Sequence, residues 1–195
     1  MLHEIYTQIS NLLNNGLSTT KHPFHIACVA TINIDGFPES RFLVLREANL
    51  ESKYLLFQTD IRSNKINSIK SNPHAEVVFY DKESKIQVRI PVKIQVHNQD
   101  DVTLKRWNLL QHYSKLCYST PNAPGDLLND PSDNDIDYSK HATKQELLES
   151  GYVNFSVLMC FFDKIEYLYL SSKGHIRACI YWNDKGEKEL QWLAP

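Results

Sequence analysis

Hydrophobic positions near the start of the chain repeat with the period of an α-helix. They stand at i, i+4, i+7 and i+8 and form one apolar stripe, made of Ile5, Ile9, Leu12 and Leu13. Gly16 follows this stripe at the place where a glycine commonly ends a helix. The chain is therefore predicted to begin with an amphipathic helix that ends near Gly16.

The hydrophobic period changes to that of β-strands at Phe24. The run Phe24–Ile34 is rich in β-branched residues and stops at Asp35-Gly36, a dipeptide typical of hairpin turns. A further turn is predicted at Asn183–Gly186, between the last two strands. The other predicted strands are Glu39–Arg46, Lys53–Thr59, Ala75–Tyr80, Ile86–Val96, Tyr152–Phe162, Ile165–Leu170, His175–Trp182 and Glu189–Leu193.

Helical patterns interrupt the strands at about Ser63–Lys70, Asp101–Leu116 and Thr143–Ser150. Residues 119–142 are rich in Pro, Asn, Asp and Ser, and they are predicted to form a loop-rich excursion. The second helix is expected to bury Leu104, Trp107, Leu110 and Leu116.

Strands joined mostly by hairpins, with few helices between them, indicate a mainly β, antiparallel architecture. A barrel of six to eight strands with peripheral helices fits this order better than a parallel sheet, because the early strands follow one another without crossover helices. The length of 195 residues favours a single domain over residues 1–195.

Composition and charge exclude several classes of partner. The net charge of -2 leaves no global basic field to attract nucleic acid. The most apolar run, Tyr152–Phe162, is far shorter than the roughly 20 residues that a bilayer requires. The opening residues have neither the basic nor the apolar region of a secretory signal. A cytoplasmic protein without nucleic-acid or membrane partners is predicted.

Common catalytic and metal-binding signatures are missing. The chain has no GxGxxG, GxxxxGK[ST], HExxH or GxSxG motif, which counts against Rossmann dehydrogenases, P-loop NTPases, zincins and α/β-hydrolases. The cysteines form no closely spaced pair, so no metal site is predicted and reduced, mostly packed thiols are expected at Cys28, Cys117, Cys160 and Cys179.

Basic residues are concentrated in one part of the chain. Between Arg41 and His97 there are ten Lys or Arg residues against six Asp or Glu. Arg41, Arg89 and Arg177 belong to apolar β-like runs, where an unpaired charge is costly to desolvate. Each of these arginines needs an anionic partner. The residues leave open whether that partner is a carboxylate of the chain or a bound ligand.

The segment FQTDIRSNK favours a ligand. A strand ends at Thr59, and Arg62, Ser63, Asn64 and Lys65 then open a helix. Backbone N–H groups at a helix start, a serine hydroxyl and a lysine together suit a phosphate group. In the alternative interpretation Ser63 only caps the helix and the cations are solvated.

The order of these motifs resembles that of the pyridoxamine 5′-phosphate oxidase-like proteins, which bind FMN in a split β-barrel at a homodimer interface. A Trp-containing helix followed by a Pro-Gly loop, here Trp107 to Gly125, resembles the shorter and less characterised relatives. The matching elements are Val29–Arg46, Phe57–Pro73, Ile86–Ile90, Ile165–Arg177 and Leu193–Pro195.

The resemblance implies a set of FMN-binding residues. Gln87 is expected to approach the flavin ring, and Arg177 is expected to reach FMN from the neighbouring subunit. The full set implied by the resemblance is Arg41, Phe42, Leu43, Val44, Leu45, Arg46, Gln58, Thr59, Arg62, Ser63, Asn64, Lys65, Gln87 and Arg177.

The resemblance also implies that Arg46, Lys173 and His175 contact a small-molecule substrate, with His175 beside the flavin as the catalytic-site residue. In the alternative, His175 is a half-exposed strand residue. The family's motif for the substrate phosphate, Y-x-x-x-R-x-x-x-S, is broken here, because Cys117 and Pro121 follow Tyr113.

Two functions follow from this. One is an FMN-dependent oxidoreductase that passes a hydride from substrate to flavin, with oxygen as the reoxidant, as in the oxidation of pyridoxine 5′-phosphate. The other is a non-catalytic dimeric module that binds FMN or a related ligand and has no vitamin B6 activity.

Overall fold

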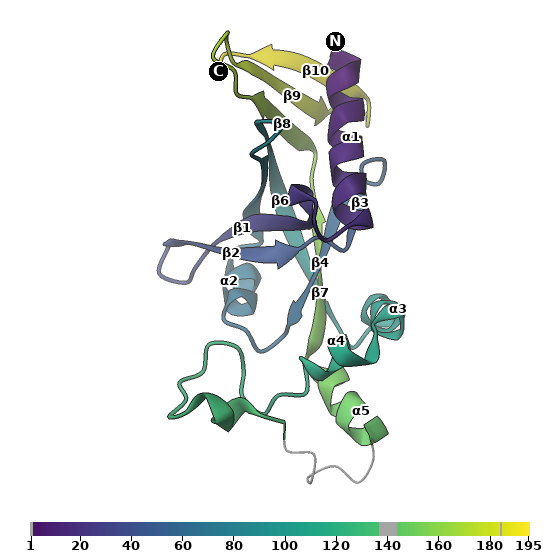
Figure 1. The fold of residues 1–195 in the computed structure, drawn as a ribbon, viewed down its shortest axis with the longest axis vertical. Coiled ribbons are helices and arrows are strands. Elements are labelled where there is room, and N and C mark those ends of the chain that lie inside the picture. Colours follow the sequence, from purple (N-terminus) through teal and green to yellow (C-terminus); the bar gives the residue numbers. More distant parts are fainter. Residues whose placement is uncertain (1, 137–143, 184) are drawn as a thin grey trace.

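The computed structural model describes residues 2–136, 144–183 and 185–195, and a single antiparallel sheet dominates it (Figure 1). The helices of this part of the chain are α1 (Leu2–Ser18), α2 (Lys65–Ser71), α3 (Asp101–Leu109), α4 (His112–Leu116) and α5 (Lys144–Asn154). Its strands are β1 (Ile26–Ile32), β2 (Pro38–Val44), β3 (Glu47–Asn49), β4 (Tyr54–Asp60), β5 (His74–Asp81), β6 (Ile86–Asn98), β7 (Phe155–Phe161), β8 (Lys164–Tyr169), β9 (Ile176–Trp182) and β10 (Lys188–Leu193).

The long strand β6 holds the two halves of the sheet together. Its first residues, Ile86–Arg89, pair with β8, and its last residues, Lys93–Asn98, pair with β7. One path runs β10-β9-β8-β6-β5-β1-β2, and β7 continues to β4 and β3. The result is an antiparallel half-barrel with several helices around it, which confirms the predicted fold class. Strand β3 was not predicted.

The inner face of the half-barrel carries the hydrophobic core. Val29, Val77 and Ile90 lie directly opposite one another on β1, β5 and β6, and all three are fully buried. Helix α1 lies along the sheet (Figure 1) and adds Ile9 and Leu13 to the same core. The predicted apolar stripe of this helix is therefore its buried face.

The prediction that Gly16 ends the first helix is wrong, because α1 continues through it to Ser18. A Cβ at Gly16 would lie 2.4 Å from the carbonyl oxygen of Phe24, closer than any side-chain carbon can approach. Glycine is needed here so that the chain entering β1 can pass directly against the helix. The requirement comes from this non-local approach.

We therefore expect Gly16→Ala to destabilise the protein by about 2 kcal/mol, since either the helix or the Phe24 backbone must move. The exposed neighbour provides a matched control. Asn15→Ala should change the free energy of unfolding by less than about 0.5 kcal/mol. Urea unfolding of both variants tests this, and equal stabilities would show that the close approach costs nothing.

The predicted helix Asp101–Leu116 is divided in two, because Leu110 adopts an extended conformation between α3 and α4. The side chain of Asp100 accepts a hydrogen bond from the backbone of Thr103, whose hydroxyl accepts one from the Asp100 backbone. This capping box turns Thr103 and Trp107 inward. Leu104 is consequently 47% exposed, so its predicted burial is wrong.

The loop-rich excursion lies below α2 in Figure 1 and contains a short 3₁₀ turn at Pro131–Asn134. Asn122 ties it together through hydrogen bonds with Asn134 and the Asp133 carbonyl. The rest of the predicted excursion, residues 137–142, lies outside the described residues, as do Thr143 of the third predicted helix and Asp184 of the last predicted turn.

All four cysteines are free thiols. Cys160 and Cys179 are buried, Cys28 is partly buried and Cys117 is exposed, so three of the four are packed as predicted. Among the described helices, none has both the length and the apolar character needed to cross a membrane.

Candidate functional site

A cluster of polar and basic side chains forms where β4 leads into α2. We call Arg41, Thr59, Ser63 and Lys65 the cation cluster. The Lys65 ammonium donates to the Thr59 hydroxyl at 3.0 Å and to the Ser63 hydroxyl at 2.7 Å. Ser63 in turn donates to the Asp60 carbonyl at 2.8 Å, so its side chain is held in place by the strand end.

Arg41 reaches this cluster from the inner face of β2. Its guanidinium donates to the Thr31 hydroxyl at 2.7 Å and to the Val29 carbonyl at 3.3 Å. The only carboxylate that it contacts among the described residues is that of Glu39, at 3.4 Å. Arg41 is thus held mainly by neutral oxygen atoms.

The two cations of this cluster repel each other. Burial, and next the charge of Arg41, lower the pKa of Lys65 below its usual 10.5, while Asp60 acts in the opposite direction. Burial likewise lowers the pKa of Arg41. Two half-buried cations whose close partners are mostly hydroxyl and carbonyl groups make a site that an anion would stabilise.

Two other predicted residues of this segment face the excursion loop. The guanidinium of Arg62 binds both carboxylate oxygens of Asp60, at 3.0 and 2.7 Å, and donates to the Thr120 carbonyl at 3.0 Å. Asn64 precedes α2 without a side-chain capping bond, and a Cβ at Gly125 would lie 3.5 Å from its amide nitrogen. Arg62 therefore anchors the loop in this structure.

The strand that carries Arg41 alternates between the two faces of the sheet. Leu43 and Leu45 share the inner side with Arg41, and Leu45 is fully buried. Phe42 and Val44 point to the outer side, where Phe42 is 76% exposed. Gln58, on β4 before Thr59, is partly buried.

Arg46 lies beyond the end of β2 and is exposed. Burial raises the pKa of Tyr118 to about 12, and the charge of Arg46 acts in the opposite direction.

A second set of predicted residues forms a row across β6, β8 and β9. Gln87 lies opposite Leu168, which in turn lies opposite Arg177. Directly opposed side chains in antiparallel strands point to the same face, roughly 5 Å apart. Gln87 also opposes the exposed Tyr80, so this row lies on the outer face of the sheet.

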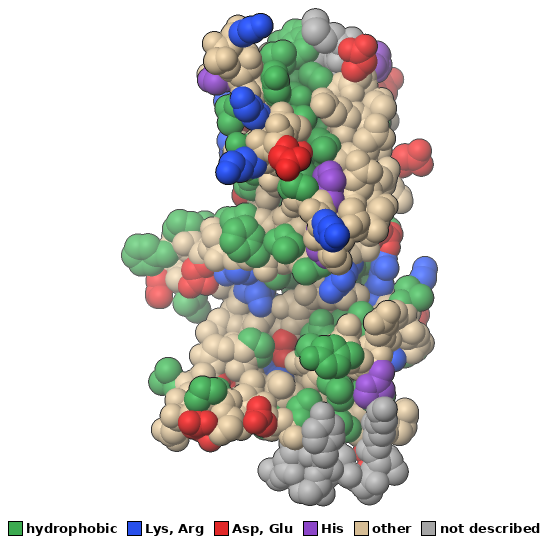
Figure 2. Space-filling model, in the orientation of Figure 1, with side chains coloured by type: hydrophobic (Ala, Val, Ile, Leu, Met, Phe, Trp, Pro, Cys, Tyr) green, Lys and Arg blue, Asp and Glu red, His purple; other side chains and the backbone are tan. Residues whose placement is uncertain are grey.

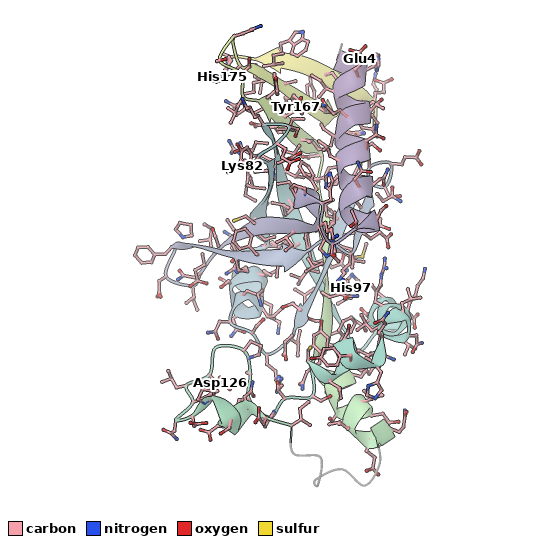
Figure 3. The ribbon with its side chains drawn as sticks, viewed as in Figure 1. Glu4, Lys82, His97, Asp126, Tyr167 and His175 are labelled. Carbon is pink, nitrogen blue, oxygen red and sulfur yellow. The ribbon has the colours of Figure 1, made fainter. Side chains whose placement is uncertain are left out.

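Lys173 and His175 belong to the exposed turn before β9. Figure 3 shows His175 at one end of the molecule and Asp126 of the excursion loop near the other. The His175 ring accepts a hydrogen bond from the backbone of Ser171 at 3.1 Å. Within one chain, the structure does not bring His175 to the cation cluster.

The cation cluster and the outer-face row lie on opposite faces of the same sheet. Arg41 opposes the buried Val29 on the inner face, whereas Gln87 and Arg177 belong to the outer face. A ligand of one chain cannot pass through the sheet to touch both sets.

Three residues of these sites were not predicted from the sequence: Thr31, Asp60 and Glu166. Thr31 binds Arg41, Asp60 holds Arg62 and Ser63, and Glu166 binds Arg177 at 2.7 Å. The resemblance included the segment Ile165–Arg177. The pairing of Glu166 with Arg177 was not predicted, because it depends on the register of β8 and β9.

The fold and the cation cluster define a class: a split-barrel protein with a cluster of cations at the strand-to-helix turn. Residues 6–98 match the family described as pyridoxamine 5′-phosphate oxidase, FMN-binding domain. The chain is 29% identical over 189 residues to pyridoxine/pyridoxamine 5′-phosphate oxidase 2 of Arabidopsis thaliana, covering 91% of this chain and 90% of that protein. It is 34% identical over 73 residues to the oxidase of Burkholderia vietnamiensis, covering 37% of this chain and 33% of that one.

Solved structures show the same fold. A pyridoxamine 5′-phosphate oxidase-related, FMN-binding protein from Nostoc punctiforme has a TM-score of 0.78 at 21% identity, covering 97% of this chain and 96% of that one. PhzG from Burkholderia lata, solved with tetrahydrophenazine-1-carboxylic acid, has a TM-score of 0.72 at 18% identity, covering 97% and 92%. Sequence and fold together relate this chain to the pyridoxamine 5′-phosphate oxidase FMN-binding split-barrel family.

Proposed function

We propose that the chain is an FMN-binding oxidoreductase and that the cation cluster holds the FMN phosphate. The observation that carries this is the pair Lys65 and Arg41. Each is partly buried, and their close hydrogen bonds go mainly to Thr59, Ser63, Thr31 and backbone oxygen. A phosphate between them would remove their mutual repulsion and accept charge-assisted hydrogen bonds from both.

We infer that the working form is a homodimer with FMN between two chains. The cation cluster and the Gln87–Arg177 row occupy opposite faces, so one FMN contacts both only if the row comes from a second copy. The outer face is also rich in exposed apolar side chains, which favour burial against a partner. They include Ile26, Phe42 and Tyr80.

The β1–β2 hairpin extends this apolar surface. It projects from the body of the half-barrel in Figure 1, and Figure 2 shows hydrophobic side chains gathered along it. Ile34 and Phe37 at its tip are largely exposed. Contact with a second copy would remove this apolar surface from water, which is energetically favourable.

When bound, FMN supplies a two-electron acceptor that oxygen can reoxidise. The residues of this chain then have separate tasks. Lys65 and Arg41 bind the phosphate, and Gln87 of the neighbouring copy offers its amide to the ring. Arg177 of the neighbouring copy would place a positive charge beside the flavin, while His175 would orient the substrate.

One observation favours the alternative of an FMN-binding module without vitamin B6 activity. Tyr113 is 81% exposed, and Cys117 and Pro121 supply no cation where the family's substrate motif has an arginine and a serine. Of the cations assigned to the substrate, Arg46 and Lys173 remain to meet its phosphate. Specificity for pyridoxine 5′-phosphate is therefore the part of the proposal that the chain supports least.

The test is a flavin titration followed by turnover. The protein should bind FMN with a shifted absorption spectrum, and pyridoxine 5′-phosphate should bleach the flavin without oxygen and yield pyridoxal 5′-phosphate in air. Tight FMN binding without bleaching would select the binding module. Failure to bind added FMN would overturn both functions.

The lowered pKa of Lys65 predicts a pH dependence of FMN binding. Phosphate binds the ammonium form, so the affinity should fall as the pH rises through the pKa of Lys65 in the free protein, below 10.5. FMN titrations at increasing alkaline pH measure this. A Lys65→Arg control keeps its charge and should lack this decline, while ionisation of the flavin ring is common to both proteins. An equal decline in both would contradict the assignment of Lys65.

A further inference from the structure

Charged side chains of alternating sign cross the outer face of the sheet. Arg89 on β6 donates to Glu76 on β5 at 2.8 Å and lies opposite Glu166 on β8. The two carboxylate oxygens of Glu166 bind different cations, Lys164 at 2.6 Å and Arg177 at 2.7 Å. Glu166 therefore joins the β6 side of this charged row to Arg177 on β9.

Glu166 is the most enclosed member of this row. Its side chain is 12% exposed, against 31% for Arg177 and 40% for Lys164. Hydrogen bonds from Arg177 and then from Lys164 lower the pKa of Glu166 to about 2, so its carboxylate is charged throughout the physiological range. Glu166 is thus a charged and largely buried partner of two more exposed cations.

Glu166 binds Arg177 through only one nitrogen of its guanidinium, Nη2. A guanidinium has five N–H donors, and within the described residues only Nη2 of Arg177 has a side-chain acceptor. The remaining donors are available to a ligand outside the chain. An unanchored arginine would have to lose its rotamer freedom on binding, which lowers affinity.

We propose that Glu166 is a positioning residue that holds Arg177 ready to contact FMN bound in the neighbouring copy. This inference rests on the proposed function, because it requires Arg177 to touch FMN across a dimer. Glu166 itself would not contact the flavin. Its contribution is to fix the direction of the guanidinium before the cofactor arrives.

The direction in which the FMN affinity changes when the charge of Glu166 is removed distinguishes positioning from a simple electrostatic effect. FMN is an anion, so removing the negative charge of Glu166 should by itself strengthen binding. Loss of positioning should weaken it. We expect Glu166→Gln to raise the Kd of FMN about tenfold despite the favourable change in net charge.

Glu76→Gln is the matched control. It removes the same charge from the same face but from a residue that binds Arg89 and not Arg177. This control should not weaken FMN binding. A lower or unchanged Kd in Glu166→Gln would overturn the positioning role.

Glu166→Asp provides a second, charge-neutral test. It keeps the carboxylate but shortens its reach by one methylene, so positioning predicts weaker FMN binding and a field effect predicts no change. Sedimentation of each apo variant establishes that it still forms the wild-type assembly. If Glu166→Gln fails to assemble, Glu166→Asp decides, and wild-type affinity in that variant would overturn the inference.

Arg177→Gln separates failure of this inference from failure of the proposed function. If Arg177→Gln weakens FMN binding and the Glu166 variants do not, the positioning role is wrong and the FMN site stands. If Arg177→Gln does not change the FMN affinity, Arg177 does not contact FMN. Both the positioning role of Glu166 and the proposed contact of Arg177 with FMN are then wrong. In the expected result the double variant Glu166→Gln, Arg177→Gln binds FMN no more weakly than Arg177→Gln alone, because Glu166 acts only through Arg177.

Discussion

The double variant Arg41→Ala, Lys65→Ala is expected to bind FMN at least a hundredfold more weakly than the wild-type protein. Each side chain would donate a charge-assisted hydrogen bond to the phosphate, worth roughly 1.5–3 kcal/mol. Two such losses correspond to about 3 kcal/mol or more, and every 1.4 kcal/mol is about tenfold in affinity. Quenching of FMN fluorescence measures the Kd, and each single variant should lose about tenfold.

Two controls make this result specific. Lys70→Ala removes an exposed lysine from the same helix and should leave the Kd unchanged. Riboflavin lacks the phosphate, so its affinity should differ little between the wild-type protein and the double variant. Wild-type affinity for FMN in the double variant would mean that the phosphate lies elsewhere.

Phe42→Asp is expected to convert the apo protein from a dimer to a monomer at micromolar concentration. Phe42 is largely exposed and lies opposite Cys28 on the outer face, in the middle of the apolar surface assigned to the second copy. Burying a new carboxylate there without a partner would cost several kcal/mol. Sedimentation velocity without FMN measures the assembly independently of any contact between residue 42 and the cofactor.

Leu109→Asp is the matched control, because it adds the same charge at another exposed apolar position, on α3. It should leave the assembly unchanged. If the Phe42→Asp monomer forms, its FMN affinity should also fall, since the neighbouring Arg177 is lost with the partner. A Phe42→Asp protein that remains dimeric would place the contact surface elsewhere and would leave the role of the outer face unexplained.

Features of this protein that depend on neighbouring residues could be predicted from the sequence. The apolar stripe of α1 and the Asp35-Gly36 hairpin depend on neighbouring residues, and both are present in the structure. Thr59, Ser63 and Lys65 stand within seven positions of a strand-to-helix turn, so local geometry alone was enough to bring their side chains together. The family resemblance added the expected partner, FMN.

Long-range features were not readable in this way. The role of Gly16 depends on the backbone of Phe24, and the orientation of Arg62 depends on a carbonyl 58 residues away, at Thr120. Leu104 follows the helical period, yet the capping box of Asp100 and Thr103 sets the phase of α3 and leaves Leu104 exposed. In each case a contact with a distant segment, or a cap, outweighed the local pattern.

The sequence by itself determined the antiparallel architecture and the clustering of Thr59, Ser63 and Lys65, because strand periodicity, turn residues and adjacent side chains act over a few positions. Tertiary structure alone decided which faces the arginines occupy. Strand register puts Arg41 inside the half-barrel and Arg177 outside it, bound to Glu166. A shift of one residue in either strand would exchange the faces, since side chains alternate along a strand, and the proposed need for a second copy follows from that register.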